Sequence, residues 1–436
     1  MHRQETSMQI DSAAVGRQIP LSSQKWHSQD TVWMLGMFGT AIGAGVLFLP
    51  INAGLGGIVP LMIITALALP IAYYSHRALA HFAQASTAAD KGLIAAVEEH
   101  FGITAKRVIA SIYFATIFSI LLMYSIAVTN TTLSFMEHQM GIEAPSRALV
   151  SIVLILVLLG IVSLGQEKTM RVMSALVYPF IGSLVVIALY LIPKWNLSVF
   201  TSFSAESFAL DTSALMTLWL TFPVLVMSFN HFPIISPFVV VQKQTYGSEC
   251  DRKCASIQLR SCLLMVGVVL FFVYSCILSL SPADLQAAKD QNISVLSYLA
   301  NRYNTPTIAY LASFIAFVGI NKSFLGHYVG AYEVMEDALA KVSGSHGWGL
   351  SKRTRNALIL AFTISCCWIA AWLNINVLSI IESFAGPAGA IILLLLPMYA
   401  IHKVPALAPY RGRISNVFVT TVGMITVSAI FYSILR

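Results

Sequence analysis

The chain has 436 residues, of which 57% are hydrophobic and only 10% are charged. A soluble domain holds about 45–50% apolar and about 25% charged residues, so a soluble fold of this composition would expose large apolar patches. The composition excludes a single soluble core, and it excludes intrinsic disorder, which needs the opposite composition. A polytopic membrane protein remains, and the formal charge of +7 then bears on topology rather than on nucleic-acid binding.

Hydropathy divides the chain into apolar segments that are long enough for membrane-spanning helices of about 20 residues. Lipid offers the backbone no hydrogen-bond partners, so each segment should be helical, and no strand-like alternation suggests a barrel. Eleven segments are predicted, with approximate bounds 31–51, 57–82, 106–135, 146–164, 168–193, 213–240, 257–281, 306–337, 354–374, 376–400 and 414–434. No apolar run precedes them, so the first helix should itself direct insertion.

Lys and Arg residues are distributed unevenly between the two sides of this arrangement. The N-terminal tail and the loops after even-numbered helices hold 20 of them, whereas the other loops and the C-terminus hold 5. Cytoplasmic loops carry the excess of positive charge. We therefore expect a cytoplasmic N-terminus and an outer C-terminus.

The first segment has glycines at its centre, in the run GTAIGAGVLFLP. Glycine weakens a helix and allows a sharp turn of the backbone. The alternative is that Gly39 and Gly43 form a small-residue pair that packs helices together. After the second segment, residues 91–102 (KGLIAAVEEHFG) predict a short amphipathic helix on the cytoplasmic side. In the third segment, Tyr124, Thr129 and Asn130 offer hydrogen-bonding groups, and Tyr124 suits either packing or substrate contact.

The sixth segment, LTFPVLVMSFNHFPIISPFVVV, contains three prolines. Each proline removes a backbone donor, and Ser228, Asn230 and His231 place polar groups in mid-span. Such a helix is costly in a bilayer unless it lines a cavity, although a kinked helix with an internally satisfied polar cluster is an alternative. Residues 282–304 hold a short apolar piece, ISVLSYLAN, that fits a cap over an outer vestibule.

Lys322 stands near the middle of the eighth segment. A lysine there costs about 2.5–3.5 kcal/mol on insertion scales, so it should face protein or water and be functional, with a structural ion pair as the alternative. Ser323 follows it, and His327 reads as an internally bonded histidine rather than a proton relay. In the tenth segment Glu382 precedes a Gly386–Pro387 break and is a candidate for gating or proton transfer at the outer vestibule.

The broken helices are the first and the sixth, which suggests two five-helix repeats followed by one more helix. Because five is odd, the second repeat is inverted, and paired breaks of this kind indicate a substrate site at the midplane. The free N–H groups at such breaks suit a carboxylate. We expect the divisions 1–30 (cytoplasmic tail), 31–193 (first repeat), 213–400 (second repeat) and 401–436 (loop and eleventh helix).

Neither metal-ligand spacing nor an enzymatic motif appears in the sequence. A P-loop and a nucleophile triad are both missing, and the glycine-rich run follows no strand, so it is not a dinucleotide fingerprint. The six cysteines fit buried thiols. We expect no enzyme activity and no cofactor or metal. The expected partners are the lipid bilayer and a small molecule that carries a carboxylate, with neither nucleic acid nor an obligate protein partner.

The runs GTAIGAGVLFLPINAG, VEEHFG, SFNHFPIISPF, LSPADLQAAKDQNISVLSYLAN, KSFLGHYVGAYE and LPMYAIHKVPAL resemble the bacterial hydroxy/aromatic amino acid permease family, especially its serine transporter branch. The resemblance extends from about Trp33 to the C-terminus. It implies a proton-coupled amino acid symporter of the inner membrane, importing L-serine, with the leucine-transporter type of five-plus-five inverted fold.

By position, the resemblance implies that the break in helix 1 binds the substrate carboxylate and amine. Together with the polar groups noted above, the predicted substrate site comprises Thr40, Ala41, Ile42, Gly43, Ala44, Gly45, Tyr124, Asn130, Ser228, Phe229, Asn230 and His231, and the predicted coupling residues are Lys322, Ser323 and Glu382. The chain departs from the serine branch at Phe232 and Pro237, where small polar residues are usual. Threonine or cysteine therefore remains an alternative substrate, and a non-transporting amino acid sensor is a more distant one.

Overall fold

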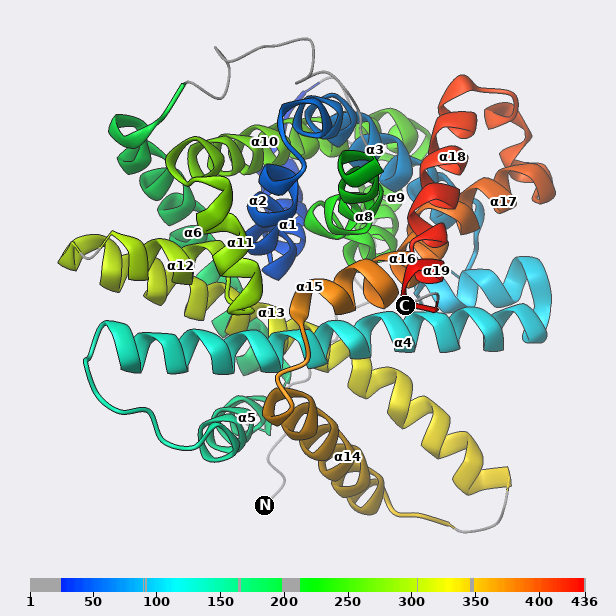
Figure 1. Ribbon diagram of the computed structural model, residues 1–436. Helices are drawn as coiled ribbons and strands as arrows, with labels where there is room; N and C mark the ends of the chain where they lie inside the picture. Colours follow the sequence, from blue (N-terminus) through cyan, green and yellow to red (C-terminus); the bar gives the residue numbers. More distant parts are fainter. Residues whose placement is uncertain are drawn as a thin grey trace.

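The computed structural model describes residues 25–88, 90, 92–163, 166–197, 212–303, 305–345 and 349–434. Within these ranges all regular secondary structure is helical, and the helices surround a central group formed by α1, α2 and α8 (Figure 1). The expected cytoplasmic tail falls mostly on residues 1–24, outside the described part of the chain. The boundary expected between the repeats falls on residues 198–211, which also lie outside it.

The order of the elements follows the apolar segments read from the sequence. In chain order the helices are α1 (Ser28–Ala41), α2 (Ala44–Leu55), α3 (Ile58–Ala85), α4 (Leu93–His138), α5 (Arg147–Ser163), α6 (Gln166–Leu191), η3 (Ile192–Lys194), α8 (Thr212–Ser228), η5 (Phe232–Ile234), α9 (Ile235–Tyr246), η6 (Gly247–Glu249), α10 (Cys250–Ser279), α11 (Pro282–Asp290), α12 (Val295–Arg302), α13 (Pro306–Ser345), α14 (Lys352–Trp372), α15 (Val377–Ile380), η7 (Ile381–Ala385), α16 (Gly386–Ala390), η8 (Ile391–Leu395), α17 (Leu396–Lys403), η9 (Pro405–Tyr410), α18 (Ile414–Ser428) and α19 (Ile430–Ile434).

Seven helices in the described part of the chain are long and apolar enough to cross a membrane, and the bent pair α1–α2 makes an eighth. Shorter apolar helices cover Arg147–Val162 and Pro179–Lys194. These lengths and compositions define a polytopic membrane protein.

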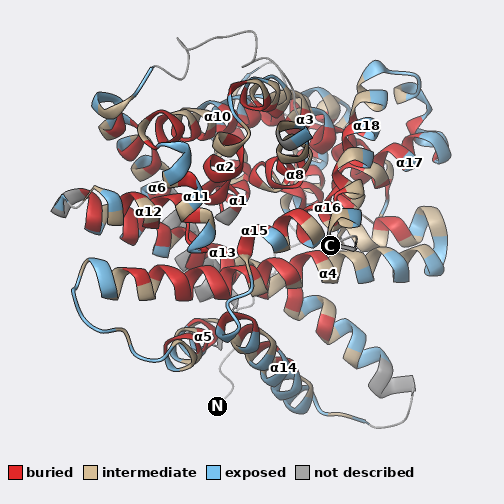
Figure 2. Cartoon of the chain, viewed as in Figure 1, coloured by how far each residue is buried: buried red, intermediate tan, exposed pale blue. Residues whose placement is uncertain are grey.

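Apolar side chains lie on the outside of the helix assembly as well as in its core. On α5, Leu149 and Val157 are more than half exposed, and on α14 so is Trp372. Figure 2 shows that burial is concentrated on the central helices, whereas much of α14 is exposed. Water would penalise these exposed apolar faces, but the hydrocarbon of a bilayer does not, which agrees with a membrane setting.

The predicted break in the first segment is confirmed. The helix α1 ends at Ala41, Ile42 and Gly43 are not helical, and α2 begins at Ala44. The two helices are bent by 60° relative to each other. No side chain caps the first turn of α2. The N–H of Val46 donates to the carbonyl of Gly43 at 3.2 Å, so the N–H groups that this helix can offer to a ligand are those before Val46.

The predicted break in the sixth segment is also confirmed. The helix α8 ends at Ser228, and a 3₁₀ turn, η5, precedes the next helix, α9. Pro233 lies at the start of η5, where its missing N–H and fixed φ suit a helix that begins anew rather than one that continues.

Two short loop elements agree with the sequence predictions. Gly102, with φ of 81°, separates a short first helix of α4, which buries Ala96 and Val97, from the long membrane helix. The apolar piece at residues 282–304 forms α11 and α12, and Leu285 of α11 packs against Gly54 of α2. This contact covers α2 at a distance of about three turns from the break.

The tenth segment differs from the prediction of a break at Gly386–Pro387. The chain stays helical from Val377 to Lys403 and contains two π-helical turns, η7 and η8. Pro387 and Pro397 lie at the beginnings of the α-helical pieces that follow them. A π turn accommodates the N–H that proline lacks without ending the helix.

Candidate functional site

The two helix breaks lie against each other at the centre of the molecule. A Cβ atom added to Gly45, in the first turn of α2, would lie 3.0 Å from the backbone N and Cα of Ser228 at the end of α8. Only glycine permits this approach without displacing backbone. The glycine-rich run of the first segment therefore does more than weaken a helix, because it allows the ends of two helices to meet.

A small cavity lies beside this contact and is lined by residues of α1, the beginning of α2, α4, α8, the break after α8, α13 and η7. Its wall consists of Thr40, Ala41, Gly43, Gly45, Met123, Tyr124, Met227, Asn230, His327 and Ile381. The cavity has a volume of about 20 Å³, which is room for about one water molecule. The site is thus contracted, and an amino acid would fit only after the surrounding helices move apart.

Gly43 brings the break of helix 1 into contact with α4 and α13. A Cβ atom at Gly43 would lie 2.3 Å from the hydroxyl oxygen of Tyr124 and 3.0 Å from Oγ of Ser323. The Tyr124 hydroxyl therefore approaches the backbone of the break, and Ser323 lies at the same point. These contacts place Tyr124 and Ser323 beside the non-helical backbone of the first break.

Lys322 on α13 is directed at the end of α1. Its ammonium donates hydrogen bonds to the carbonyl oxygens of Gly39 and Ile42, the latter at 3.4 Å, and the side chain is buried. The last carbonyls of a helix lack intrahelical donors and carry the negative end of its dipole. The sequence alternative, a structural ion pair with a carboxylate, is not what the structure shows, since backbone carbonyls are the recorded partners.

The polar residues of the sixth segment point in different directions. Asn230 lines the cavity, and its Oδ1 accepts a hydrogen bond from the N–H of Phe232 at 3.1 Å. His231 is buried away from the cavity, where its ring stacks on His76 of α3 with 3.5 Å between the centroids. The backbone N–H of His231 donates to Nε2 of His76 at 3.0 Å. His231 therefore ties the break to α3.

Ser228, Phe229 and Ile42 are not part of the cavity wall. The Ser228 hydroxyl donates to the carbonyl of Val224 at 2.7 Å, and Phe229 and Ile42 are fully buried side chains. Their backbones still form the two breaks. The side chain of Ala44 lies outside the described part of the chain.

Asn130 is a correction to the predicted site. Its amide nitrogen donates to the carbonyl of Asn292 at 2.6 Å, and its oxygen accepts from Arg147. Arg147 in turn donates to the carbonyl of Ala371 and to Asn374. Asn130 lies about 9 Å further along α4 than Tyr124, so it belongs to a network that joins α4, α5 and the end of α14.

Glu382 is also placed differently from the prediction. It does not face an open vestibule, because its side chain is buried and accepts a hydrogen bond of 2.6 Å from Nδ2 of Asn52. Asn52 lies on α2, two turns beyond the break. The contact therefore joins α2 to η7.

Four residues of the cavity wall were not in the predicted site. Met123, Met227 and Ile381 contribute apolar surface, and His327 contributes an imidazole that contacts the ring of Tyr124 at 5.4 Å between centroids. The sequence carried one usable signal for His327: it lies one turn beyond Ser323 and hence on the same face of α13. The apolar residues resemble ordinary membrane-helix residues and gave no signal.

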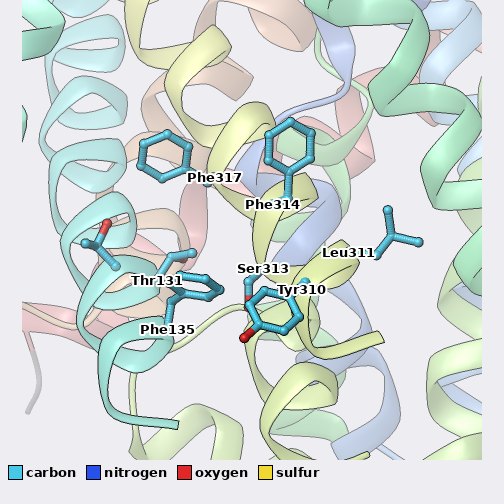
Figure 3. A pocket seen from close by; sticks show the side chains of 8 residues that line it. Thr131, Phe135, Tyr310, Leu311, Ser313, Phe314 and Phe317 are labelled. Atoms are coloured by element: carbon cyan, nitrogen blue, oxygen red, sulfur yellow. The ribbon is translucent and has the colours of Figure 1, made fainter. Parts of the chain in front are cut away.

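A larger cavity of about 650 Å³ lies between α4 and α13. Figure 3 shows its aromatic lining, in which Phe135 of α4 approaches Tyr310 of α13, with Phe314 and Phe317 further along the same helix. Phe314 is 63% exposed. With no charged side chain in its wall, this groove is poorly suited to a zwitterion, so we place the candidate site at the helix breaks. Among the described residues, no group of three or more His, Cys, Asp or Glu is arranged to hold a metal ion.

A membrane protein whose broken helices meet at a small central cavity belongs to the class of secondary transporters, in which discontinuous helices form the substrate site. Sequence comparison agrees with this class. Residues 32–430 match the tryptophan/tyrosine permease family, and the chain belongs to that family. It is therefore an amino acid permease of the inner membrane rather than an enzyme.

Individual relatives cover almost the whole chain. The serine transporter SdaC of Escherichia coli K12 is 49% identical over 414 residues, which cover 95% of this chain and 96% of the relative. The Shigella flexneri SdaC is 48% identical over the same length. The threonine/serine transporter TdcC of Escherichia fergusonii is 44% identical over 426 residues, with 94% and 96% of the two chains covered.

Proposed function

We propose that this permease imports L-serine together with a proton across the bacterial inner membrane by alternating access. The observation that carries the proposal is the meeting of the two helix breaks at one cavity, where Gly45 contacts Ser228. Two relatives at 49% and 48% identity are serine transporters, and that name motivates the choice of substrate.

The helix ends at the cavity offer the charges that a zwitterion requires. The N-terminus of α2 carries the positive end of its dipole and suits the substrate carboxylate. The last carbonyls of α8 suit the ammonium, whereas at the end of α1 the carbonyls of Gly39 and Ile42 already bond to Lys322. Gly43 keeps this backbone accessible, because any side chain would collide with Tyr124. In this scheme the polar side chains of the wall, Asn230 and His327 among them, are left to recognise the substrate side chain.

The proposed fold has eleven spans in two inverted five-helix repeats, residues 31–193 and 213–400, followed by an eleventh helix. The length of one helical region, Ala214–Ser279, supports more than eight membrane spans. Its 66 residues would extend about 99 Å as one straight helix, roughly three times the hydrocarbon thickness, so it must cross more than once. The 20-to-5 distribution of Lys and Arg supports a cytoplasmic N-terminus and an outer C-terminus.

Lys322 is the proposed coupling group, with Ser323 beside it. A sodium ion at a helix break would bind carbonyl oxygens. The Lys322 ammonium contacts the carbonyl oxygens of Gly39 and Ile42 in the same way, as a cation. When the proton leaves, the hydrogen bonds lose their charge and weaken, which frees α1 to move relative to α13. Glu382 is proposed only as a gating residue, through its bond to Asn52 on α2.

A third cavity, distinct from the two described above, supports a route by which the substrate could leave. It has a volume of about 230 Å³ and lies between α3, the beginning of α4, η5 and α13, with Glu333 in its wall. The distribution of Lys and Arg supports a cytoplasmic position for this side. Tyr113 and Phe232 contact each other in its wall, with 5.5 Å between the ring centroids, and are suited to close the route between this cavity and the breaks.

Proton coupling is energetically sufficient for uptake. Serine is a net-neutral zwitterion at neutral pH, so a single accompanying proton makes transport electrogenic. One charge gains about 2.3 kcal/mol per 100 mV, which corresponds to about fiftyfold accumulation.

Uptake of radiolabelled serine into proteoliposomes tests the proposal. Serine should accumulate when a pH gradient is imposed and not when a sodium gradient replaces it. Because TdcC at 44% identity is a threonine/serine transporter, unlabelled threonine should be tested as a competitor; stronger inhibition by threonine than by serine would favour threonine as the main substrate. Accumulation driven by sodium alone would contradict proton coupling.

A further inference from the structure

One side chain of the cavity wall has an unused acceptor. His327 lies on α13, and its Nδ1 is 2.8 Å from the carbonyl oxygen of Ser323. A carbonyl can only accept, so Nδ1 must carry the hydrogen. In the neutral ring Nε2 then has a lone pair and can only accept a hydrogen bond.

The neutral ring fits its surroundings. An imidazolium would need a compensating anion, and no carboxylate of the described residues forms an ion pair with His327. The half-buried ring lines the cavity. The contact with Tyr124 is between rings, so within the described part of the chain Nε2 is left without a recorded hydrogen-bond donor.

The position of His327 relative to the break suits a short substrate. Ser323 lies beside Gly43, where the N-terminus of α2 begins. His327 follows on the same face of α13, about 6 Å along the helix axis. A ligand whose carboxylate is bound at Gly43 can therefore present its side chain to His327. Met123, Met227 and Ile381 make the apolar part of the wall. Of its other polar side chains, Thr40 donates its hydroxyl to the carbonyl of Gly36, and Oδ1 of Asn230 already accepts from the N–H of Phe232.

We propose that Nε2 of His327 accepts a hydrogen bond from the side-chain hydroxyl of the substrate, so that His327 makes the site selective for hydroxy amino acids over alanine. This inference rests on the proposed function, since it assumes an amino acid at the helix breaks. An alanine side chain brings no donor, and its binding leaves a buried acceptor unpaired, which is the arrangement that discriminates strongly between similar substrates.

Binding of serine, threonine and alanine to the purified full-length protein, measured by isothermal titration, tests the inference without requiring transport. His327→Phe keeps an aromatic ring against Tyr124 but removes the acceptor, so serine should bind about tenfold more weakly while alanine affinity is unchanged. His327→Gln restores a carbonyl acceptor and should recover part of the serine preference. Unchanged alanine binding also reports that the variant site is intact.

A matched control exists in α4, where Nδ1 of His138 bonds to the carbonyl of Ser134 at 3.1 Å in the same way. His138 is exposed and outside the cavity, so His138→Phe should leave all three affinities unchanged. A wild-type serine-to-alanine ratio in His327→Phe overturns the inference, as does equal binding of the two ligands by the wild type. Selective binding that depends on His327, without uptake in vesicles, would instead reject the transport proposal and leave this inference standing.

Discussion

At the scale of single residues, the site depends on a lysine that bonds to backbone rather than to an acid. The carbonyls of Gly39 and Ile42 are the ends of a broken helix, and without Lys322 they would be buried acceptors with no helical donor. Leaving such a group unpaired costs about 1–3 kcal/mol. The lysine thus stabilises the break through the same hydrogen bonds that the proposed coupling would weaken.

Replacement of Lys322 should separate coupling from substrate exchange. Lys322→Met keeps the length of the side chain and removes the charge, so a pH gradient should no longer drive serine accumulation, while downhill exchange of serine survives in part. Lys322→Arg keeps a permanent charge and should fail as well, because a guanidinium does not release its proton in the working range.

The control for this experiment is Lys341→Met on the same helix, where an exposed lysine pairs with Asp337. It should leave accumulation unchanged, because surface pairs contribute little. If folded, membrane-inserted Lys322→Met concentrates serine with wild-type pH dependence, Lys322 is only a structural cation.

Gly43 gives a second prediction at this scale. In Gly43→Ala the new methyl would lie 2.3 Å from the Tyr124 hydroxyl oxygen, so Tyr124 or the break must shift and serine affinity should fall about tenfold or more. Removing the hydroxyl in the double variant Gly43→Ala with Tyr124→Phe should restore part of the affinity, as expected for residues in direct contact.

Isothermal titration with serine measures all of these variants. Gly36→Ala serves as the control, because its methyl would lie 3.5 Å from Ile234, an ordinary contact, and it should bind serine like the wild type. Additive losses in the double variant would show that the Tyr124 contact does not limit binding.

The sequence predicted which residues are unusual better than it predicted where their side chains point. Lys322 was identifiable because a charge in a membrane helix is costly. Asn130 and Tyr124 were equally plausible in the third segment, and only the packing of α4 against Arg147 shows that Asn130 faces elsewhere. The rotation of a helix about its axis depends on all of its neighbours, so a local pattern does not determine it.

At the scale of elements, both ends of α1 are held. At its beginning, Asp30 forms a buried ion pair of 2.6 Å with Lys253 of α10 and accepts a hydrogen bond of 2.7 Å from the Tyr246 hydroxyl. At its end, Lys322 holds the carbonyls. Any movement of the beginning of α1 away from α10 must therefore break or carry along the contact at Asp30.

Removal of one partner from the Asp30–Lys253 pair should destabilise the protein strongly. Both side chains are at most 2% exposed, so Lys253→Met leaves an uncompensated buried carboxylate, at a cost of about 3–5 kcal/mol. The free energy of unfolding in detergent measures the effect. The exposed pair Lys341–Asp337 is the control, and Lys341→Met should lower stability by less than about 1 kcal/mol. Equal effects of the two substitutions would mean that the α1 contact is not buried in solution.

The helix breaks were predictable because they have local causes, whereas the π turns were not. Glycine in the first segment widens the range of backbone conformations, and proline in the sixth segment removes a backbone donor. In the tenth segment Gly386 and Pro387 form a similar local signal, yet the chain stays helical. The role of Gly386 is determined by packing. A Cβ atom at Gly386 would lie 2.4 Å from the side chain of Pro223 in α8, so this glycine allows a close contact between two helices.

At the scale of the whole molecule, polar and apolar residues are arranged for two different surroundings. Buried polar groups such as Asn52, His76 and Lys322 lie in the interior, and apolar side chains cover α5 and α14 on the outside. The number of helices and their apolar composition follow from hydropathy. The sequence identifies neither the contacts of α11 and α12 with the central helices nor the contracted state of the cavity, since both depend on how separate helices pack.

The orientation of the molecule in the membrane is the last prediction. Twenty Lys and Arg residues lie on the side of the N-terminus and five on the side of the C-terminus, and such an excess marks the cytoplasmic side. With eleven spans the two termini are on opposite sides. Alkaline phosphatase fused after Arg436 should therefore be active, since it folds outside the cytoplasm, and a fluorescent protein fused there should be dark. The same pair of fusions after Gly247, in η6 between α9 and α10, is the internal control and should show the opposite pattern. A fluorescent C-terminal fusion would mean an even number of spans. It would then contradict the proposed arrangement of two five-helix repeats followed by one additional helix.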